Sequence, residues 1–219
     1  MSIRKTYAVL GLGRYGTAVA KELANSGAEV LAVDMDENVV NRAAVEIPFC
    51  KCANITDPEV FKQLGIGDVD EVIIAMANSL ESTVMAITLC KENGVKSVIV
   101  KCGNEMQQKI YTRVGADKVV FPEKESGIRL AKNLLSAGFV DMIELSKGVS
   151  MVELDVLDNW AGKNLIELNL RKKYGLNIVA IRKNGEVQVD VNPEEPLSTD
   201  MKLIVIANVP SLKEKSFVP

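Results

Sequence analysis

Three closely spaced glycines and one acidic residue near the amino terminus are the best candidates in this chain for binding a ligand. Gly11, Gly13 and Gly16 follow the spacing G-x-G-x-x-G, and Asp34 comes 23 positions after Gly11. Such glycines permit a tight turn after a strand, a close approach of the backbone to a phosphate, and close packing of the following helix. The carboxylate can accept hydrogen bonds from a ribose. The pattern predicts a nucleotide site, provided that its surroundings also fit.

The surrounding segments read as the strand, helix and second strand that such a site requires. Residues 6–10 are strand-like, residues 17–23 are helix-like, and residues 29–33 form a second apolar strand that ends at Asp34. Asp34 would accept hydrogen bonds from a ribose diol and would repel a 2′-phosphate, which disfavours NADP. Asp36 either shares this task or caps the next helix, and capping is the interpretation we favour.

Arg14 and Tyr15 lie inside the glycine loop and bear on the choice of nucleotide. A guanidinium at this position can form paired hydrogen bonds to a terminal phosphate. The loop therefore points to ATP or ADP as well as to NAD(H). We include Tyr15 among the predicted cofactor-binding residues.

The rest of the chain lacks the residues with which nucleotide-using enzymes commonly do chemistry. It contains no histidine, no Tyr-x-x-x-Lys pair and no G-x-x-x-x-G-K-[ST] sequence. Histidine is the commonest acid–base group near neutral pH, and hydride transfer usually needs a proton donor. We therefore predict a sensor and not an enzyme. An NAD-dependent oxidoreductase and a nucleotide-blind assembly module stay open as alternatives.

Composition excludes several other classes. The 219 residues carry 26 basic and 29 acidic side chains without a concentrated basic block, so nucleic acid is not an expected partner. No apolar run approaches the roughly 18 residues of a membrane span, and no secretory signal is recognisable. We expect a cytoplasmic protein.

The four cysteines could be structural thiols or metal ligands. Cys50 and Cys52 stand two apart on a predicted strand, which places them on one face. A C-x-C pair without histidine or a second pair is a poor zinc site. We favour buried structural thiols.

Strand-like and helix-like runs alternate over the first 121 residues, which predicts an α/β fold: a Rossmann-like, doubly wound parallel sheet. One helix is predicted to open at Asp57-Pro58, and another at Asn78 with Glu81 as its capping partner. The predicted strands are residues 6–10, 29–33, 49–52, 70–75, 97–101 and 117–121.

A crossover helix and a small α+β module complete the predicted organisation. The helix, at about residues 124–137, has an unusually wide apolar face, and either joins two domains in the core or docks in a dimer. Beyond it the patterns predict strands, one short helix near Leu165 to Leu170, and a type I′ turn at Asn184-Gly185. We assign residues 1–139 to a nucleotide-binding domain and residues 140–219 to the α+β domain.

Several of these segments, taken in order, resemble the RCK (regulator of K+ conductance) family, and most of all KtrA/TrkA-type regulatory subunits of bacterial potassium uptake. The matching segments are YAVLGLGRYG at 7–16, VLAVDMD at 30–36, VGAD at 114–117 and PEK at 122–124. The segments at residues 170–175 and 178–181 are similar to the RCK C-terminal domain, which serves in ligand binding and dimerisation.

The resemblance implies a homodimer that assembles into a cytosolic ring, typically an octamer. The ring docks on a potassium-translocating membrane subunit of Ktr or Trk type, at the inner face of the plasma membrane. The resemblance further implies that ATP favours the active state of the ring and ADP the inactive state, so that nucleotide exchange would gate the partner.

The resemblance also implies roles for single residues. Arg14 would contact the phosphates, Asp34 the ribose, and Asp36 and Asn54 the adenosine surroundings. The chain reads Ala53-Asn54-Ile55-Thr56 where the family commonly has Gly-Asp-x-Thr, which leaves the adenine contacts open.

Two further positions concern the phosphates and a cation. By resemblance, Glu123 would help to hold Mg2+ or Ca2+ near the γ-phosphate, between paired subunits. Lys101 is a candidate phosphate contact, although a lysine there also makes a good solvated strand end.

Some relatives bind cyclic di-AMP through their C-terminal domain. Ile178, Val191 and Pro193 are candidate counterparts of the residues that do so. An ordinary β-core explains Ile178 and Val191 equally well.

Overall fold

The computed structural model describes residues 5–76, 79–135 and 139–208, and the chain divides into two compact units, Met1–Glu123 and Lys124–Pro219. The predicted fold class is confirmed: a parallel sheet with helices is followed by a small antiparallel sheet. The domain boundary at residue 139 stays a prediction. In the described part of the chain, no helix combines the length and apolar character needed to cross a membrane.

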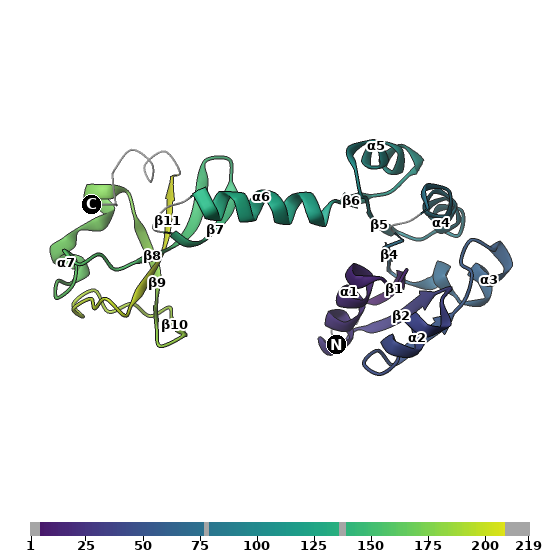
Figure 1. The fold of residues 1–219 in the computed structure, drawn as a ribbon, viewed down its shortest axis with the longest axis horizontal. Helices are drawn as coiled ribbons and strands as arrows, with labels where there is room; N and C mark the ends of the chain where they lie inside the picture. The colour runs from purple at the N-terminus through teal and green to yellow at the C-terminus, as the bar shows by residue number, and fades with distance from the viewer. Residues whose placement is uncertain (1–4, 77–78, 136–138, 209–219) are drawn as a thin grey trace. The chain divides into compact units, whose positions relative to one another are not determined.

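The first unit is built around a six-stranded parallel sheet with the order β3-β2-β1-β4-β5-β6 (Figure 1). This is the strand order of a doubly wound dinucleotide-binding fold, in which the direction of winding reverses between β1 and β4. Its elements are β1 (Thr6–Leu10), α1 (Arg14–Asn25), β2 (Glu29–Asp34), α2 (Glu37–Ala43), β3 (Phe49–Cys52), α3 (Pro58–Gln63), the short 3-10 helix Ile66–Asp68, β4 (Glu71–Ile74), α4 (Leu80–Glu92), β5 (Ser97–Lys101), α5 (Glu105–Val114) and β6 (Lys118–Val120).

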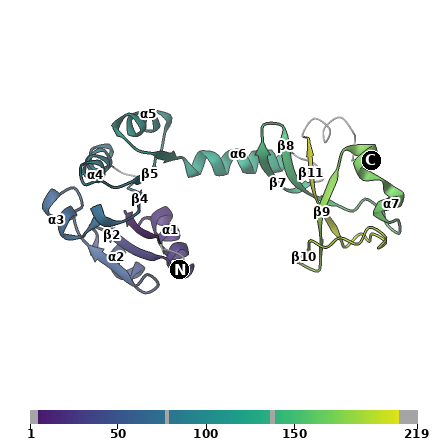
Figure 2. The same ribbon diagram turned by 180° about the vertical axis from the view of Figure 1, so that it is seen from behind.

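Helices cover both faces of this sheet. Because successive strand residues point to opposite sides, they are buried alternately against one layer of helices and the other. Ala8 and Leu10 of β1 pack with Phe61, Ile87 and other residues of α3, α4 and α5. Val9 packs on the other face, in a cluster formed with α1 and α2 (Figures 1 and 2). The helices packed on both faces hold the strands in place, and thereby also position the loops that follow the carboxyl ends of the strands.

The N-cap of α3 is the predicted residue, whereas the N-cap of α4 is a different residue. Asp57 caps α3 by accepting hydrogen bonds from the N–H groups of Glu59 and Val60, as predicted. The N-cap of α4 is Ser79, whose hydroxyl accepts from the N–H of Ser82. The predicted cap, Asn78, lies outside the described residues.

The second unit contains a five-stranded antiparallel sheet with the order β10-β9-β11-β8-β7. One face of it carries a core that includes Trp160, Leu176 and Leu203. Its elements are β7 (Phe139–Ser146), β8 (Val149–Asp155), α7 (Leu165–Leu168), α8 (Leu170–Tyr174), β9 (Asn177–Lys183), β10 (Glu186–Gln188) and β11 (Lys202–Asn208).

Two turns of this unit depend on a left-handed backbone. Asn184 (φ 52°) and Gly185 (φ 84°) confirm the predicted type I′ hairpin. Asn169 (φ 46°) interrupts the predicted single helix and divides it into α7 and α8. An asparagine tolerates this conformation better than most residues do, so the break falls there.

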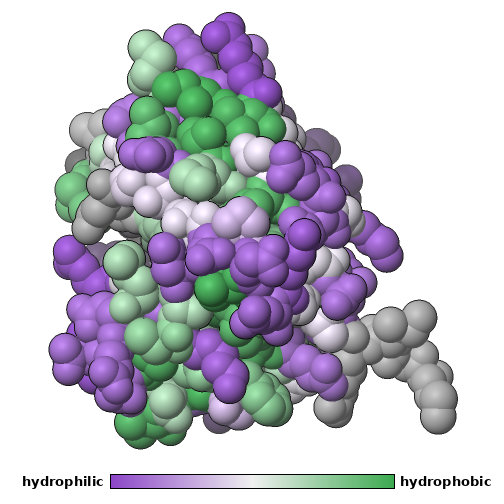
Figure 3. All heavy atoms as spheres, turned by 90° about the vertical axis from the view of Figure 1, so that its right-hand side faces the viewer, coloured by the Kyte–Doolittle hydropathy of each residue, from purple (hydrophilic) through white to green (hydrophobic). Residues whose placement is uncertain are grey.

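Helix α6 (Pro122–Leu135) leads from β6 to β7 (Figure 1). It exposes Ile128, Leu130 and Leu134, which accords with its predicted wide apolar face. Apolar side chains are also exposed on the first unit, including Met85 and Met106 of α4 and α5. The space-filling view shows several apolar patches between hydrophilic side chains (Figure 3).

Candidate nucleotide-binding site

The predicted site residues follow the carboxyl ends of neighbouring parallel strands. Gly11 comes after β1, Asp34 ends β2, Asn54 comes after β3, and Lys101 ends β5. Because the strands are parallel, all of these ends lie at one edge of the sheet, beside the point between β1 and β4 where the winding reverses. This is the edge at which open α/β sheets bind ligands.

Gly11 and Gly16 are required by the protein itself. Gly11 has φ +94° and donates its N–H to the carbonyl of Val33 at 2.8 Å. A Cβ there would lie 2.9 Å from the Met76 side chain, and a Cβ at Gly16 would lie only 1.9 Å from the carbonyl oxygen of Gly11. The turn and the start of α1 therefore pack too closely for a side chain at either position.

Gly13 differs from these two glycines. It has an ordinary φ of −64°, and a Cβ there would meet nothing within 4 Å. It is the N-cap of α1 and has no side chain with which to cap the helix. The space beside the start of α1 is therefore open on this side, and it fits a phosphate bound by helix N–H groups.

Asp34 ties the glycine loop to β2. Its Oδ2 accepts the N–H of Leu12 at 2.6 Å, and its Oδ1 accepts the N–H of Asp36 at 3.0 Å. A carboxylate has further lone pairs, so the ribose role stays open. Sequence reasoning missed this bracing role, although the pairing of Leu10 with Val33 in the parallel register brings the two chain segments together.

Asp36 and Asn54 lie on the exposed side of the same edge. Asp36 caps α2 by accepting the N–H of Asn38 at 2.9 Å, which confirms the capping interpretation. The Asn54 side-chain oxygen accepts from the N–H and the hydroxyl of Thr56, at 3.2 and 2.8 Å. Neither side chain is needed for the core, and their adenosine roles stay predictions.

Lys101 and Glu123 form an ion pair beside the ring of Tyr15. Lys101 Nζ lies 2.7 Å from Glu123 Oε1 and 6.0 Å from the centroid of the Tyr15 ring. The Lys101 side chain is only 11% exposed. The alternative of a solvated strand end is therefore wrong, because the side chain is largely covered and its charge is paired with Glu123.

The positive charges of Lys101 and Arg14 both act on the Glu123 carboxyl. The hydrogen bond from Lys101 lowers the pKa of the Glu123 carboxyl below its ordinary value, and the charge of Arg14 acts in the same direction. Arg14, an exposed residue at the start of α1, is thus close enough to Glu123 to share one electrostatic environment. The structure brings Arg14, Tyr15, Lys101 and Glu123 together.

Carboxylate oxygen is the ligand class that Mg2+ and Ca2+ prefer, and the Glu123 side chain is 61% exposed. Glu123 therefore fits as one cation ligand. Among the described residues, no three acidic, cysteine or histidine side chains gather into a metal-binding group. Further ligands would have to come from water, from phosphates or from another copy of the chain.

The cysteines divide into two pairs. Cys90 and Cys102 are buried, and burial raises the pKa of Cys90 to about 12. Cys52 is exposed and Cys50 is partly buried, so the expectation of buried thiols is wrong for Cys52. The exposure follows from the position of β3, which is an edge strand.

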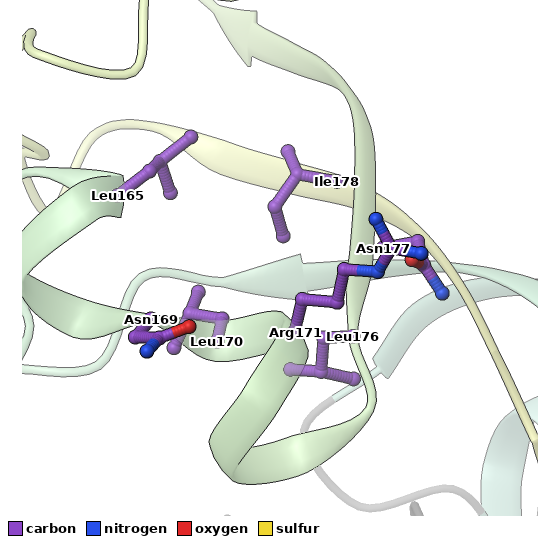
Figure 4. A pocket seen from close by; sticks show the side chains of 7 residues that line it. All are labelled: Leu165, Asn169, Leu170, Arg171, Leu176, Asn177 and Ile178. Carbon is purple, nitrogen blue, oxygen red and sulfur yellow. The ribbon is translucent and has the colours of Figure 1, made fainter.

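A separate pocket of about 240 Å³ lies in the second unit (Figure 4). Of the predicted cyclic di-AMP residues, Ile178 lines it, and the carbonyl of Pro193 accepts the N–H of the lining residue Leu165 at 3.1 Å. Val191 packs against the core. The pocket is lined by Leu165, Asn169, Leu170, Arg171, Leu176, Asn177 and Ile178.

Sequence patterns did not single out the polar lining of this pocket. Asn169, Arg171 and Asn177 come from a helix break, a short helix and the start of β9. The one available signal was an asparagine inside a helical pattern, because asparagine favours such breaks.

Comparison with known proteins identifies two domain families. The TrkA-N domain matches residues 7–122, and the TrkA-C domain matches residues 149–214. The chain is 37% identical to Ktr system potassium uptake protein C of Bacillus subtilis (strain 168), over 94% of each chain. It is 34% identical to Ktr system potassium uptake protein A of the same organism, over 95% of this chain and 94% of that protein.

Solved structures share the fold. The GsuK channel matches with a TM-score of 0.67 at 17% identity, and covers 97% of this chain. The GsuK RCK domain matches with a TM-score of 0.52 at 23% identity, and covers 96% of this chain. This chain spans only 39% and 45% of those two structures, so they support its architecture alone.

Proposed function

The chain belongs to the family of proteins with TrkA-N and TrkA-C domains, which includes Ktr system potassium uptake proteins, and on that basis we propose that it is a nucleotide-sensing regulatory subunit. It forms a cytosolic ring that gates a potassium-translocating membrane partner of Ktr or Trk type. The observation that carries the proposal is the open space at Gly13, which precedes Arg14 and lies two residues before Tyr15, whose ring centroid is 6.0 Å from Lys101 Nζ.

The phosphate end of the site accounts for adenine nucleotide binding. The start of α1 would bind phosphate through backbone N–H groups, and Arg14 and Lys101 would add charge-assisted hydrogen bonds. Asp34 would bind the ribose hydroxyls at the opposite end. The acid at Asp34 favours a free 2′-hydroxyl, as in ATP, ADP and NAD(H), over the 2′-phosphate of NADP.

Discrimination between ATP and ADP would arise at Arg14 and Glu123. A third phosphate gives Arg14 an additional partner, and together with Glu123 it offers oxygen ligands to Mg2+ or Ca2+. A ligand shifts a conformational equilibrium only as far as it binds one state better than the other. Contacts that only the triphosphate makes supply that difference.

The second pocket is proposed to bind cyclic di-AMP. Asn169, Arg171 and Asn177 can donate hydrogen bonds to phosphate or base atoms, and Leu165 and Ile178 supply apolar walls (Figure 4). A second copy of the domain would supply the other half of a site for a two-fold symmetric ligand.

The assembly proposed is a homodimer that forms an octameric ring at the cytoplasmic face of the membrane. The exposed apolar residues Ile128, Leu130 and Leu134 of α6 support self-association, because a monomer rarely leaves such residues uncovered together.

The test combines native mass spectrometry of the purified chain with calorimetric titration of ATP, ADP and NADH. We expect an adenine nucleotide to co-purify with an oligomer, and Gly13→Ala to bind it at least about ten-fold more weakly while its melting temperature stays unchanged. A monomer that binds no nucleotide would contradict the proposal and favour an assembly module. Turnover of reduced nicotinamide would instead favour an oxidoreductase.

A further inference from the structure

The Lys101–Glu123 ion pair joins a covered cation to an accessible acid. The Lys101 side chain is 11% exposed, whereas that of Glu123 is 61% exposed. A covered ammonium group is costly unless an anion accompanies it, so Lys101 depends on its partner more than Glu123 does. Lys101 therefore holds the Glu123 carboxylate, which could otherwise bind another cation.

The position of Tyr15 places the same lysine beside the proposed phosphate site. Tyr15 is the second residue of α1, directly after the open region at Gly13 and Arg14, and its ring centroid is 6.0 Å from Lys101 Nζ. A phosphate bound at the start of α1 would offer Lys101 a second anionic partner of higher charge. Lys101 thus has one partner in the structure and another within the proposed site.

We propose that Lys101 couples anion and cation binding by exchanging partners. Without nucleotide it occupies Glu123 and weakens cation binding there. When a nucleotide phosphate attracts Lys101, the Glu123 carboxylate is released and binds a divalent cation. This inference rests on the proposed function and adds the coupling element to that same site.

The exchange has a reciprocal consequence. If a nucleotide strengthens cation binding by releasing Glu123, the cation must strengthen nucleotide binding by the same factor. Direct ligation of the cation by phosphate would produce a similar reciprocity. The two origins differ in one respect: only partner exchange predicts that removing the Lys101 charge improves cation binding without nucleotide and no longer improves it once nucleotide is bound.

The experiment is therefore a titration of the full chain with Ca2+, followed by isothermal calorimetry, first after nucleotide removal and then with saturating ADP. Lys101→Met keeps the length of the side chain and removes its charge. Without nucleotide we expect it to bind Ca2+ about five-fold or more tightly than the unchanged chain, and with ADP we expect the two affinities to be equal. Lys101→Arg keeps the ion pair and should behave like the unchanged chain. Lys101→Gln serves as a second uncharged variant if Lys101→Met unfolds.

Two controls assign the effect to this ion pair. Lys21→Met removes another paired lysine, one that contacts Glu46, and should leave Ca2+ binding unchanged. Adding Glu123→Gln to Lys101→Met should abolish the gain. Equal Ca2+ affinity without nucleotide in the folded uncharged Lys101 variants and the unchanged chain, or a gain that persists with ADP, would overturn the proposal.

The outcome is separable from that of the proposed function. Nucleotide binding by the unchanged chain is measured in its own titration with ADP. A chain that binds ADP but shows no gain in Lys101→Met retains the proposed function and loses the partner exchange. If Lys101→Met binds Ca2+ more tightly but the chain binds no nucleotide, the Lys101–Glu123 pair still controls cation binding, and the proposed nucleotide ligand is ruled out.

Discussion

The candidate nucleotide site of the first unit and the pocket of the second unit are built in different ways. The first is shaped by backbone: Gly11 and Gly16 allow contacts that a Cβ would block, and strand ends place Asp34 and Lys101. The second is shaped by side chains on two short helices and one strand. A site made of backbone tolerates little change in residue size, whereas a site made of side chains can change its specificity without changing its fold.

The largest expected effect is that of Gly16→Ala, which tests whether backbone packing shapes the first site. The added methyl would lie 1.9 Å from the Gly11 carbonyl oxygen, so α1 must move. We expect a loss on the order of 3 kcal/mol in the free energy of unfolding of the first unit. Hydrogen exchange of the β1 and α1 amides measures it.

Gly127→Ala is the matched control for that change. A Cβ there meets nothing within 4 Å, and alanine is the better helix former, so stability should stay equal or rise by up to about 1 kcal/mol. Equal protection of the β1 and α1 amides in Gly16→Ala and in the unchanged chain would remove the distinction between the two sites.

The floor of the second pocket should respond as an ordinary apolar core. Leu176 is 1% exposed and both lines the pocket and packs in the core. Leu176→Ala should cost about 2 to 3 kcal/mol of unfolding free energy in the second unit, because it leaves a cavity. Urea unfolding followed by the fluorescence of Trp160, the single tryptophan, reports it.

Ile166→Ala provides the comparison, since Ile166 is 59% exposed on the neighbouring helix α7. It should change the free energy of unfolding by less than about 0.5 kcal/mol. Similar losses for both variants would show that the pocket floor is not a distinct core position.

Asp117 tests how far the first unit depends on charged hydrogen bonds. Partial burial acts to raise the pKa of Asp117, but hydrogen bonds from Lys91 and from the N–H of Val98 outweigh it and lower the pKa. Its stabilisation is therefore present above the unfolded pKa near 4 and is lost as the pH falls through the lower folded pKa. Asp117→Asn should cost about 1 kcal/mol at pH 7, since the side chain is 45% exposed, and less at pH 3.

Urea midpoints of both proteins at pH 7 and pH 3 measure this difference. The sign follows from the direction of the shift: the carboxylate stabilises the fold only while it is ionised. A cost that grows as the pH falls would contradict the assigned cause.

The smallest effect concerns the helix break beside the second pocket. Asn169 has a left-handed backbone (φ 46°), so Asn169→Ala should cost about 1 kcal/mol, whereas Asn169→Gly should be close to neutral. Thermal unfolding of the two variants compares them. Equal melting temperatures would show that the left-handed turn does not constrain the pocket.

The contrast between the sites also explains what the sequence could predict. The glycine spacing and the apolar strands were enough to place Gly11, Asp34 and Lys101 at one sheet edge, because parallel strands bring their carboxyl ends together. The Lys101–Glu123 pair, by contrast, joins residues on different elements and depends on side-chain conformations that no periodicity encodes.

Local conformation set the other limits on prediction. The break at Asn169 depends on the left-handed backbone of that residue, and the α4 cap depends on the side-chain hydroxyl of Ser79. A pattern of apolar residues reports neither. The polar lining of the second pocket follows from that break. The polar lining could therefore not be predicted from a pattern that shows α7 and α8 as one continuous helix.

The central claim is that the glycine loop distinguishes nucleotides by their terminal phosphate, through Arg14. Calorimetric titration of ATP and ADP with Mg2+ into the unchanged chain, Arg14→Ala and the control Arg42→Ala, which alters an exposed arginine of α2, tests it directly. The account predicts a preference for ATP of about ten-fold in the unchanged chain and in Arg42→Ala, and equal affinities in Arg14→Ala. An unchanged ATP/ADP ratio in Arg14→Ala would contradict it.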